Sequence, residues 1–538
     1  MGQRWHSFML LKENGLSVNF LWPVRTYRGL HVSVDKTQFL LCIRFTLLAA
    51  TAGLSACGGG GSGDVGGAGP GVTMPADPGT VSAGSGAVAP PVSNTAPSGC
   101  APIGTANARS NALNVTAATY LGLGAGDVAH GVDIAPDCTV LLAGRFSQTD
   151  FSVNPVALAA GATTGALVRL NPSGQTVQAV SRLGSEITDL AVRPGQGDIA
   201  LASNVGLMVV AADLRTVRWQ VSGAAQRVAM AADGSVAALF GKTLRVYNAT
   251  GQEQFSRNFG DSAVNDVAID SASNRVMVTG FAQRDGGGCS QLQVAWIRSY
   301  QFNNTAAWAA WDWTHAQAAA GSNCADTRGM RVAMGRDGKL YFAGESAGGN
   351  AIYRWQPTNL ALAAPNVKTD SYNDALNTAS NHISYFARLD PSTGALEKGQ
   401  MLLARLSNGR GNTIRPRAIA ADELGNVYVG GVSASAIAQR PALSINGRTL
   451  ADYSGGDPWV LAVSSDFMQR RLWITPADGG RGETLGLAAS GGIAAMAARV
   501  EALPFVLAAP VQAITAGTAS GNTAGFAMVW PGYRVLSP

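Results

Sequence analysis

The stretch IAADELGNVYVGG, residues 419–431, contains two short apolar runs joined by the turn-favouring pair Gly425-Asn426. Two such runs around a tight turn predict a β-hairpin. Similar stretches recur along the chain, with turns such as Asp233-Gly234 and Asp337-Gly338. The seven stretches begin at residues 132, 190, 228, 267, 332, 419 and 485. The sequence therefore predicts one hairpin module that is repeated seven times.

A second strand running into a turn recurs between these hairpins, at residues 166–175, 244–252, 386–395 and, more loosely, 459–467. Each repeat then has two hairpins. The repeats begin 38 to 87 residues apart, and a four-stranded propeller blade needs about 40–50 residues, with insertions lengthening its loops. Because radial closure protects sheet edges, the expected fold class is all-β, a seven-bladed β-propeller.

Small residues recur inside the first strand of the repeats. A strand near a propeller axis is crowded by its neighbours, so a small side chain there favours close packing of the blades. Asp133 departs from this pattern. The small residues are Ala191, Ala229, Ala268, Ala333, Ala420 and Gly486.

Two segments resemble the repeat of bacterial seven-bladed β-propeller (SBBP-type) proteins: GRFSQTDFSVNPVALAAGATTGALVRLNPSGQ at 144–175 and AIAADELGNVYVGG at 418–431. GGDPWVLAVSSDF at 455–467 follows the pattern more loosely. The resemblance covers about residues 120–530 at the level of repeats; the third repeat is short, and the seventh has Ala and Gly where the usual turn stands. It implies the propeller fold and an extracytoplasmic setting, and it carries no catalytic residues.

The segment before the repeats has the features of an export signal. Arg44 precedes ten apolar residues, Phe45 to Leu54, which end in Leu54-Ser55-Ala56-Cys57; a membrane-spanning helix needs roughly 20. The pattern resembles a bacterial lipoprotein signal, which implies that Cys57 becomes the lipidated first residue and anchors the protein. By the same resemblance, Gly58 rather than Asp after the cysteine implies sorting to the outer membrane. The alternative is a chance cysteine after an ordinary signal peptide.

Three regions are therefore expected. Residues 1–56 form a signal-peptide region, whose start is overextended if Val34 is the true first residue. Residues 57–99 form a lipidated tether that is rich in Gly, Pro and Ser and has too little apolar surface to fold, so we expect a disordered linker. Residues 100–538 form the β-propeller domain.

Charge is sparse and nearly balanced. Only 14% of the residues are charged, and beyond residue 56 the chain has 33 Lys and Arg against 32 Asp and Glu. Proteins that bind nucleic acid neutralise its phosphates with many Lys and Arg side chains. The sequence therefore predicts no nucleic-acid partner.

Four cysteines follow Cys57, and an even number in an exported chain favours disulfides. We expect Cys100 to pair with Cys138 and Cys289 with Cys324. Metal binding is the rival interpretation, but the sequence has no CxxC pair and only three histidines after Cys57. No cofactor is expected either, because the glycine-rich run at 120–126 opens no helix.

One motif points to a different function. Gly344-Glu345-Ser346-Ala347-Gly348 matches the nucleophile elbow of esterases and lipases. Ser346 would be the nucleophile and His382 the base, oriented by Asp370, Asp374 or Asp390. Against this, the chain has no HGG-type oxyanion motif, and the next repeat places Gly431-Val432-Ser433 at the same point after its strand. An envelope serine hydrolase is kept as the alternative.

Two groups of residues are candidates for facing a ligand. The aromatic run Trp308, Trp311 and Trp313 is either a platform for sugars or packing within the fold. The charged residues Asp189, Arg227, Asp266 and Arg331 each precede the first strand of a repeat. In a propeller they would ring one mouth of the channel with alternating charge, or they are ordinary solvated turn residues.

The expected function is a non-enzymatic, lipid-anchored propeller in the cell envelope that binds an envelope protein or a glycan. The first alternative is the serine hydrolase, and the second is a subunit of an outer-membrane assembly complex.

Overall fold

The computed structural model describes residue 100 and residues 111–533, with gaps at 123–125, 148–150, 152, 261, 286–287, 290, 368–381, 407–410, 435–436, 438–442, 453–454 and 512–522. These residues belong to one compact unit, Val92–Pro538. The predicted signal region, Cys57 and the linker lie outside the described residues. Expectations about them stay predictions.

Strands dominate the described part of the chain, as the all-β expectation requires. They form seven sheets of four or five strands, in each of which the four main strands are antiparallel. The innermost strand of each sheet carries the first apolar run of a predicted hairpin, and the second strand carries the second run. The hairpin predicted at 419–431 is formed by β28 (Ile414–Ala421) and β29 (Val427–Ser433). The repeated β-hairpins are therefore a property of the structure.

The sheets follow one another along the chain. The first has β3 (Val128–Ile134), β4 (Val140–Arg145), β6 (Gly165–Leu170), β7 (Val177–Arg182) and β5 (Val156–Ala157). The second has β8 (Ile187–Val192), β9 (Ile199–Ser203), β10 (Gly206–Val210) and β11 (Val217–Ser222). The third has β12 (Arg227–Met230), β13 (Val236–Phe240), β14 (Thr243–Tyr247) and β15 (Glu253–Asn258). The fourth has β16 (Ala263–Asp270), β17 (Arg275–Arg284), β18 (Leu292–Tyr300) and β19 (Ala306–Ala310).

The fifth sheet has β20 (Thr327–Met334), β21 (Leu340–Ser346), β24 (Ile383–Leu389) and β25 (Leu396–Leu402). The sixth adds β32 (Asp457–Val463) and β33 (Arg470–Ile474) to β28 and β29. The seventh has β34 (Arg481–Ser490), β35 (Ile493–Ala502), β36 (Ala524–Pro531) and β2 (Ala117–Leu121).

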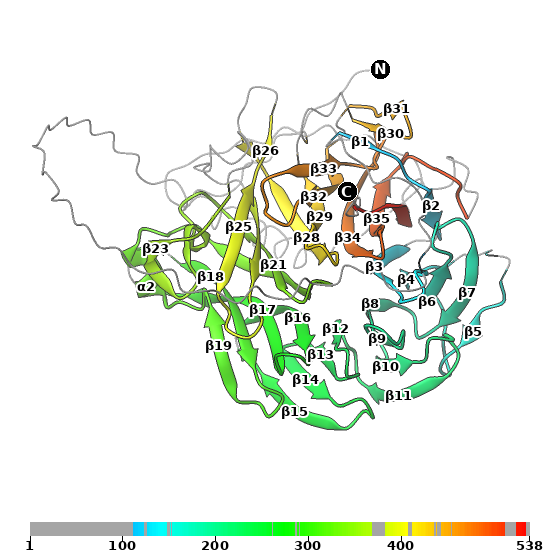
Figure 1. The fold of residues 1–538 in the computed structure, drawn as a ribbon, viewed down its shortest axis with the longest axis horizontal. Helices are drawn as coiled ribbons and strands as arrows, with labels where there is room; N and C mark the ends of the chain where they lie inside the picture. The colour runs from blue at the N-terminus through cyan, green and yellow to red at the C-terminus, as the bar shows by residue number, and fades with distance from the viewer. Residues whose placement is uncertain are drawn as a thin grey trace, which may run out of the picture. The chain divides into compact units, whose positions relative to one another are not determined.

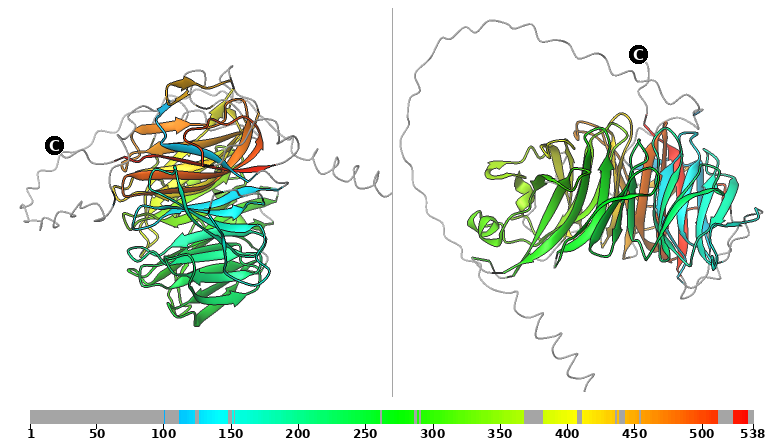
Figure 2. Two further views of the ribbon diagram at one scale, coloured as in Figure 1. Left: turned by 90° about the vertical axis from the view of Figure 1, so that its right-hand side faces the viewer. Right: turned by 90° about the horizontal axis from the view of Figure 1, so that it is seen from below.

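The innermost strands form a closed cycle. Each contacts the innermost strand of the next sheet, from β3 through β8, β12, β16, β20 and β28 to β34, and β34 contacts β3. Figure 1 shows the sheets set radially about a common centre, and the edge-on views show them side by side around it (Figure 2).

The seventh sheet is completed by a strand from the other end of the compact unit. β2 pairs with β36, and Ala118 lies opposite Met528. Because β2 precedes the first sheet in the chain, this pairing joins the beginning of the cycle to its end. The sequence does not predict this strand, since AATYL has no turn that links it to a partner.

A register shift recurs at the start of six inner strands, of the kind that a β-bulge makes. In β16 it lies between Val264 and Asp266, and in β28 between Pro416 and Ala418. The residue opposite the shift is often glycine: Gly280 in β17 faces Val264, and Gly431 in β29 faces Pro416. A Cβ on Gly280 would overlap the carbonyl oxygen of Ala263, so glycine allows the two strands to approach closely there.

The same shift corrects the alignment of the seventh repeat. In β34 it lies between Thr484 and Gly486, which places Gly486 level with the first residue after the shift in the other sheets. The position of the predicted small residues is therefore occupied by Ala488, two residues later. Ala488 is small too and lines the same central cavity as Ala191.

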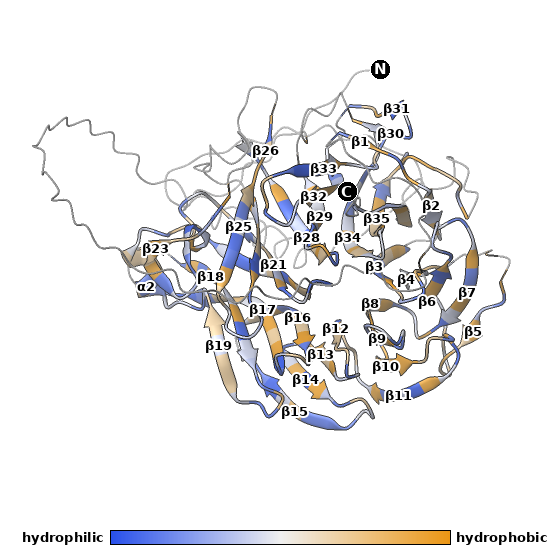
Figure 3. Cartoon of the chain, viewed as in Figure 1, coloured by the Kyte–Doolittle hydropathy of each residue, from blue (hydrophilic) through white to orange (hydrophobic). Residues whose placement is uncertain are grey.

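The hydrophobic core lies between neighbouring sheets. One cluster joins the sixth and seventh sheets, and another joins the fourth and fifth. In the third sheet hydropathy falls toward the outer strand: β13 and β14 are largely apolar, whereas β15 is polar (Figure 3).

Short elements decorate the ring: β1 (Ala112–Leu113), β30 (Ser444–Ile445), β31 (Arg448–Thr449), β22 (Trp355–Gln356), β23 (Asn359–Ala363), β26 (Ala404–Arg405), β27 (Gly411–Asn412), α2 (His315–Ala320) and the 3-10 turn η1 (Ile352–Arg354). Among the helices of the described residues, none has the length and apolar character to cross a membrane.

Candidate binding site at the mouth of the central channel

Charged side chains from four inner strands meet at the centre of the cycle. Asp189, Arg227, Asp266 and Arg331 come from four successive inner strands, β8, β12, β16 and β20. All four line a central cavity of about 350 Å³. Arg227 Nη1 lies 4.0 Å from Asp189 Oδ1. The structure thus gathers the charged residues singled out in the sequence at one place.

The carboxylates of this group also join neighbouring sheets. The backbone N–H of Val228 in β12 donates to Asp189 Oδ2 at 3.1 Å, and that of Val332 in β20 donates to Asp266 Oδ2 at 3.1 Å. Hydrogen bonds to a carboxylate are stronger than those between neutral groups. Each aspartate therefore ties its own inner strand to the following one.

Burial governs the titration of this group. It raises the pKa of Asp189 to about 6, and nearby Asp266 adds to the rise while Arg227 opposes it. Burial also raises the pKa of Asp266, against the effect of Arg331. The pKa of Arg331 falls to about 10, first because of burial and next because Arg227 lies close. Groups of like charge therefore lie close enough to repel each other, and the neighbouring groups of opposite charge offset this repulsion only in part.

Near the C-terminal ends of the inner strands, an ion pair joins distant sheets. Arg336, just after β20, donates from Nη2 to Asp133 Oδ1 at 2.8 Å and to the Ile134 carbonyl at 3.2 Å. Asp133 Oδ2 also accepts the N–H of Val192 at 2.8 Å. These partners explain why β3 carries an aspartate where other inner strands carry a small residue. The exception was visible in the sequence, but its partner Arg336 was not.

A second cavity, of about 540 Å³, lies where the inner strands begin. Arg227 and Arg331 line it together with three residues that the sequence analysis missed: Lys242, Asn265 and Arg417. Arg417 immediately precedes the Ala418 end of the register shift in β28, so aligning the shifts could have found it. Lys242 lies in the two-residue turn between β13 and β14, and no sequence pattern marked it.

Ser346 is not arranged as a nucleophile. It is the last residue of β21 and is 1% exposed, and its hydroxyl donates to the Gly348 carbonyl at 2.7 Å. His382 Nδ1 lies 3.7 Å from Glu345 Oε1, and burial lowers the pKa of this histidine while Glu345 opposes the shift. Asp390 accepts hydrogen bonds from Ser392 and Thr393 in its own turn. Asp370 and Asp374 lie outside the described residues.

Glu345, the neighbour of Ser346, is held among cations instead. Its side chain is 3% exposed, and Arg328 Nη1 lies 2.7 Å from Oε1. From β28 of the next sheet, Arg415 Nε lies 3.7 Å and Arg417 Nη1 4.0 Å from Oε2. The GESAG motif therefore forms a buried ionic contact between the fifth and sixth sheets.

The three tryptophans do not form an exposed platform. Trp311 is fully buried, and its ring packs against Phe342 with centroids 5.1 Å apart. Trp313 is 7% exposed. Trp308 is partly buried, and its Nε1 donates to the Pro391 carbonyl at 3.0 Å. The interpretation as a sugar-binding surface is wrong for Trp311 and Trp313, because packing inside the fourth and fifth sheets covers them.

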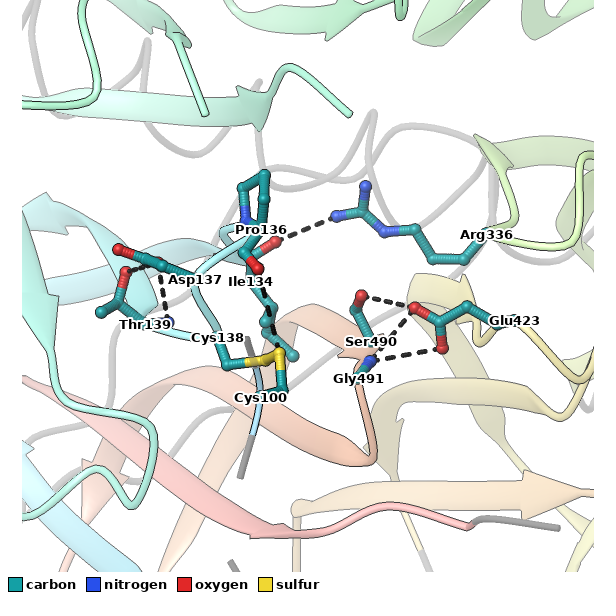
Figure 4. The surroundings of a disulfide bond; sticks show 10 residues. All are labelled: Cys100, Ile134, Pro136, Asp137, Cys138, Thr139, Arg336, Glu423, Ser490 and Gly491. Atoms are coloured by element: carbon teal, nitrogen blue, oxygen red, sulfur yellow. Dashed lines mark hydrogen bonds between the residues drawn. A yellow bond between two sulfur atoms is a disulfide. The ribbon is translucent and has the colours of Figure 1, made fainter. Parts of the chain in front are cut away.

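The Cys289–Cys324 disulfide is confirmed. It joins the β17–β18 connection to the segment after α2, with the two Cα atoms 5.5 Å apart. The structure also links Cys100 to Cys138, in the β3–β4 turn. Figure 4 shows this link beside Ser490 and Gly491, where β34 turns into β35. The Ser490 hydroxyl donates a hydrogen bond to Glu423 Oε1 at 2.6 Å.

Metal chemistry has no obvious site in this part of the chain. Among the described residues, no group of three or more His, Cys, Asp and Glu side chains is placed to hold a metal ion.

Comparison with known proteins identifies a repeat. Residues 404–437 match the family model SBBP, described as a beta-propeller repeat. They include the whole of β26, β27, β28 and β29. No curated protein matches the chain. The chain therefore carries an SBBP-type propeller repeat in its sixth sheet, as the resemblance of residues 418–431 predicted.

Proposed function

We propose that the seven sheets are the blades of a seven-bladed β-propeller that is anchored at the outer membrane through a lipidated Cys57. The propeller acts as a binding or scaffold module for a protein or glycan partner of the cell envelope. The observation that carries this proposal is the convergence of charged side chains from four inner strands on the central cavity.

Three features support the propeller as a binding module. The inner strands contact one another in a closed cycle, and the sixth sheet matches a propeller repeat, an architecture typical of protein-interaction scaffolds. Ligand sites are commonly concave, with a few polar groups converging on them. The central cavity is such a place, because Asp189, Arg227, Asp266 and Arg331 meet there.

A cross-linking experiment tests the binding function. A photo-reactive amino acid is placed at Gln226, which lines the second cavity, and separately at Gln220, an exposed residue of the outer strand β11. We expect the full chain in its native envelope to cross-link one defined partner from position 226 and not from position 220. Equal cross-linking from both positions, or none from either, would contradict the proposal.

The anchor is tested separately by substituting cysteines in the predicted signal region. Cys57→Ser should abolish the mass increase due to acylation and release the protein from the membrane fraction, because acyl chains hold it by burying CH₂ groups. Cys42→Ser is the matched control and should leave both properties unchanged. A Cys57→Ser protein that keeps its acyl mass would show that the anchor lies elsewhere or does not exist.

A further inference from the structure

The second cavity is lined by charges of a single sign. Its charged lining residues are Arg227, Lys242, Arg331 and Arg417, and its lining includes no carboxylate. The chain beyond residue 56 is almost neutral, so this concentration is local. A concave wall of one sign focuses the electrostatic potential and attracts ions of the opposite sign.

The nearest carboxylates are already engaged. Asp189 and Asp266 accept backbone N–H groups of neighbouring inner strands. Arg417 faces two carboxylates, with Glu483 Oε1 2.5 Å from its Nε and Glu345 Oε2 4.0 Å from its Nη1. These contacts satisfy part of the positive charge and leave the rest facing the cavity.

Several donors in the cavity have capacity left. Arg331 donates from Nε to the Arg417 carbonyl at 2.5 Å, while its terminal nitrogens carry further N–H groups. Arg227 makes one ion pair, and only at 4.0 Å. Lys242 is exposed, and its ammonium has no ion pair with any described residue. The pKa of Arg331 is lowered first by burial and next by Arg227, although Asp266 and Asp189 oppose the shift, so the two carboxylates offset the crowding of the cations only in part.

We propose that this cavity binds an acidic peptide segment of a partner protein, with Arg227, Lys242 and Arg331 receiving its carboxylates. The inference rests on the proposed binding function and names the chemistry of the partner. Arginine suits this role because its planar fork can bind a carboxylate through two hydrogen bonds.

The rest of the lining favours a peptide over a glycan. Leu239, Val264 and Met330 provide apolar wall between the cations, which suits the methylene groups of Glu and Asp side chains. None of the lining residues is aromatic, whereas rings of sugars commonly stack on aromatic side chains. The volume of about 540 Å³ falls in the range of small-ligand sites, roughly 300–1,000 Å³, and holds a short segment rather than a long polyanion.

Fluorescence anisotropy with a labelled hexaglutamate peptide tests the proposal on the purified chain, with hexaglutamine as the uncharged probe. We expect saturable binding of hexaglutamate only. Lys242→Glu should weaken it by about tenfold or more, since the substitution reverses one of four charges at the site. Raising the salt concentration from about 50 to about 300 mM should also weaken it, because screening shortens the reach of the field.

Charge-matched and neutral variants make the result specific. Arg215→Glu reverses an exposed charge on the β10–β11 turn and should leave binding within about twofold of wild type, which lies below the effect of one ion pair. Lys242→Gln should weaken binding less than Lys242→Glu. Equal loss with Arg215→Glu, or unchanged binding with Lys242→Glu, would overturn the proposal.

Two further outcomes separate this inference from the function on which it rests. A partner that cross-links at Gln226 but is not displaced by hexaglutamate would overturn the acidic-peptide assignment and leave the binding function standing. Tighter, Lys242-dependent binding of a sulfated hexasaccharide than of hexaglutamate would also overturn it, in favour of an anionic glycan.

Discussion

At the scale of single residues, carboxylates that are buried or half-buried connect the sheets. Asp133, Asp189 and Asp266 each accept a backbone N–H from the inner strand of the following sheet. The same side chains line the central cavity. One residue type therefore serves both the spacing of the sheets and the electrostatics of the channel.

Asp189 should make stability depend on pH. Burial raises its pKa from 3.8 to about 6, so the folded chain holds this proton more tightly than the unfolded chain. The resulting stabilisation is fully present below about pH 4 and is lost as the pH rises through about 6. Asp189→Asn keeps an acceptor for Val228 without titrating. Urea unfolding should show that the wild type loses about 1 kcal/mol of unfolding free energy relative to this variant between pH 5 and pH 7.

Asp213→Asn provides the control for this measurement. Hydrogen bonds from the backbone N–H groups of Thr216 and Arg215 lower the pKa of Asp213 to about 2. Its stabilisation is present above the unfolded pKa and disappears only as the pH falls toward 2. The difference between wild type and Asp213→Asn should stay constant from pH 5 to pH 7. A constant difference for Asp189→Asn as well would contradict the buried titration of Asp189.

Ser346 should not react as a catalytic serine. Its hydroxyl is buried and donates to the Gly348 carbonyl, and His382 faces Glu345. We expect a fluorophosphonate probe to leave the purified chain unlabelled at Ser346, as read by mass spectrometry of its peptides. An adduct on Ser346 that disappears in His382→Ala would restore the hydrolase alternative.

Sequence patterns identified some site residues and missed others for a physical reason. Asp189 and Arg331 directly precede the repeated apolar runs, inside the inner strands β8 and β20, so their convergence could be anticipated. Lys242 lies on a hairpin turn and Arg336 reaches its partner from another sheet, and neither position repeats. Trp311 belongs to an aromatic run of the kind that forms binding platforms. Only the fold decides whether such a tryptophan faces water or packs against Phe342.

At the scale of elements, a register shift marks the start of six of the seven inner strands, and a glycine lies opposite it in four of them. The shift in β16 lies opposite Gly280, and the glycine lets the Ala263 carbonyl approach. Asp266 is the first residue after this shift, and it lines the central cavity. The local backbone therefore builds part of the candidate site.

Gly280→Ala should destabilise the fold. Its Cβ would overlap the backbone of Ala263, which cannot move without disturbing β16. Overpacking of this kind lowers the free energy of unfolding by about 1–3 kcal/mol, which chemical denaturation measures. Gly288→Ala is the matched control on the next connection, where an added Cβ meets nothing within 4 Å. Equal stability of the two variants would contradict the close approach.

The hairpins were predictable because both of their strands are adjacent in the sequence and share a turn. The pairing of β2 with β36 was not, since more than 400 residues separate Ala118 from Met528 and AATYL carries no pattern of its own. The register of the seventh sheet was misjudged by two residues because its Ala-rich strands lack a side-chain pattern that fixes the alignment.

At the scale of the whole compact unit, closure makes the sheets depend on one another. Every inner strand contacts two neighbours, and β34 returns to β3. Near the strand ends, Arg336 ties the fifth sheet to Asp133 of the first. At the strand starts, the second cavity is lined by Arg227, Lys242, Arg331 and Arg417. The two ends of the channel thus differ in chemistry, and binding is expected at the cationic one.

The pairing of β2 with β36 is the contact that closes the cycle, and an engineered disulfide measures it most directly. Ala118 and Met528 are cross-strand partners, so Ala118→Cys with Met528→Cys should form a disulfide-linked peptide that mass spectrometry detects. Ala118→Cys with Ala527→Cys is the control, because residues one apart in a strand face opposite sides of the sheet. A linked 118–528 peptide, without a 118–527 peptide, is the predicted result. Free thiols at both 118 and 528 under oxidising conditions would contradict the closed ring.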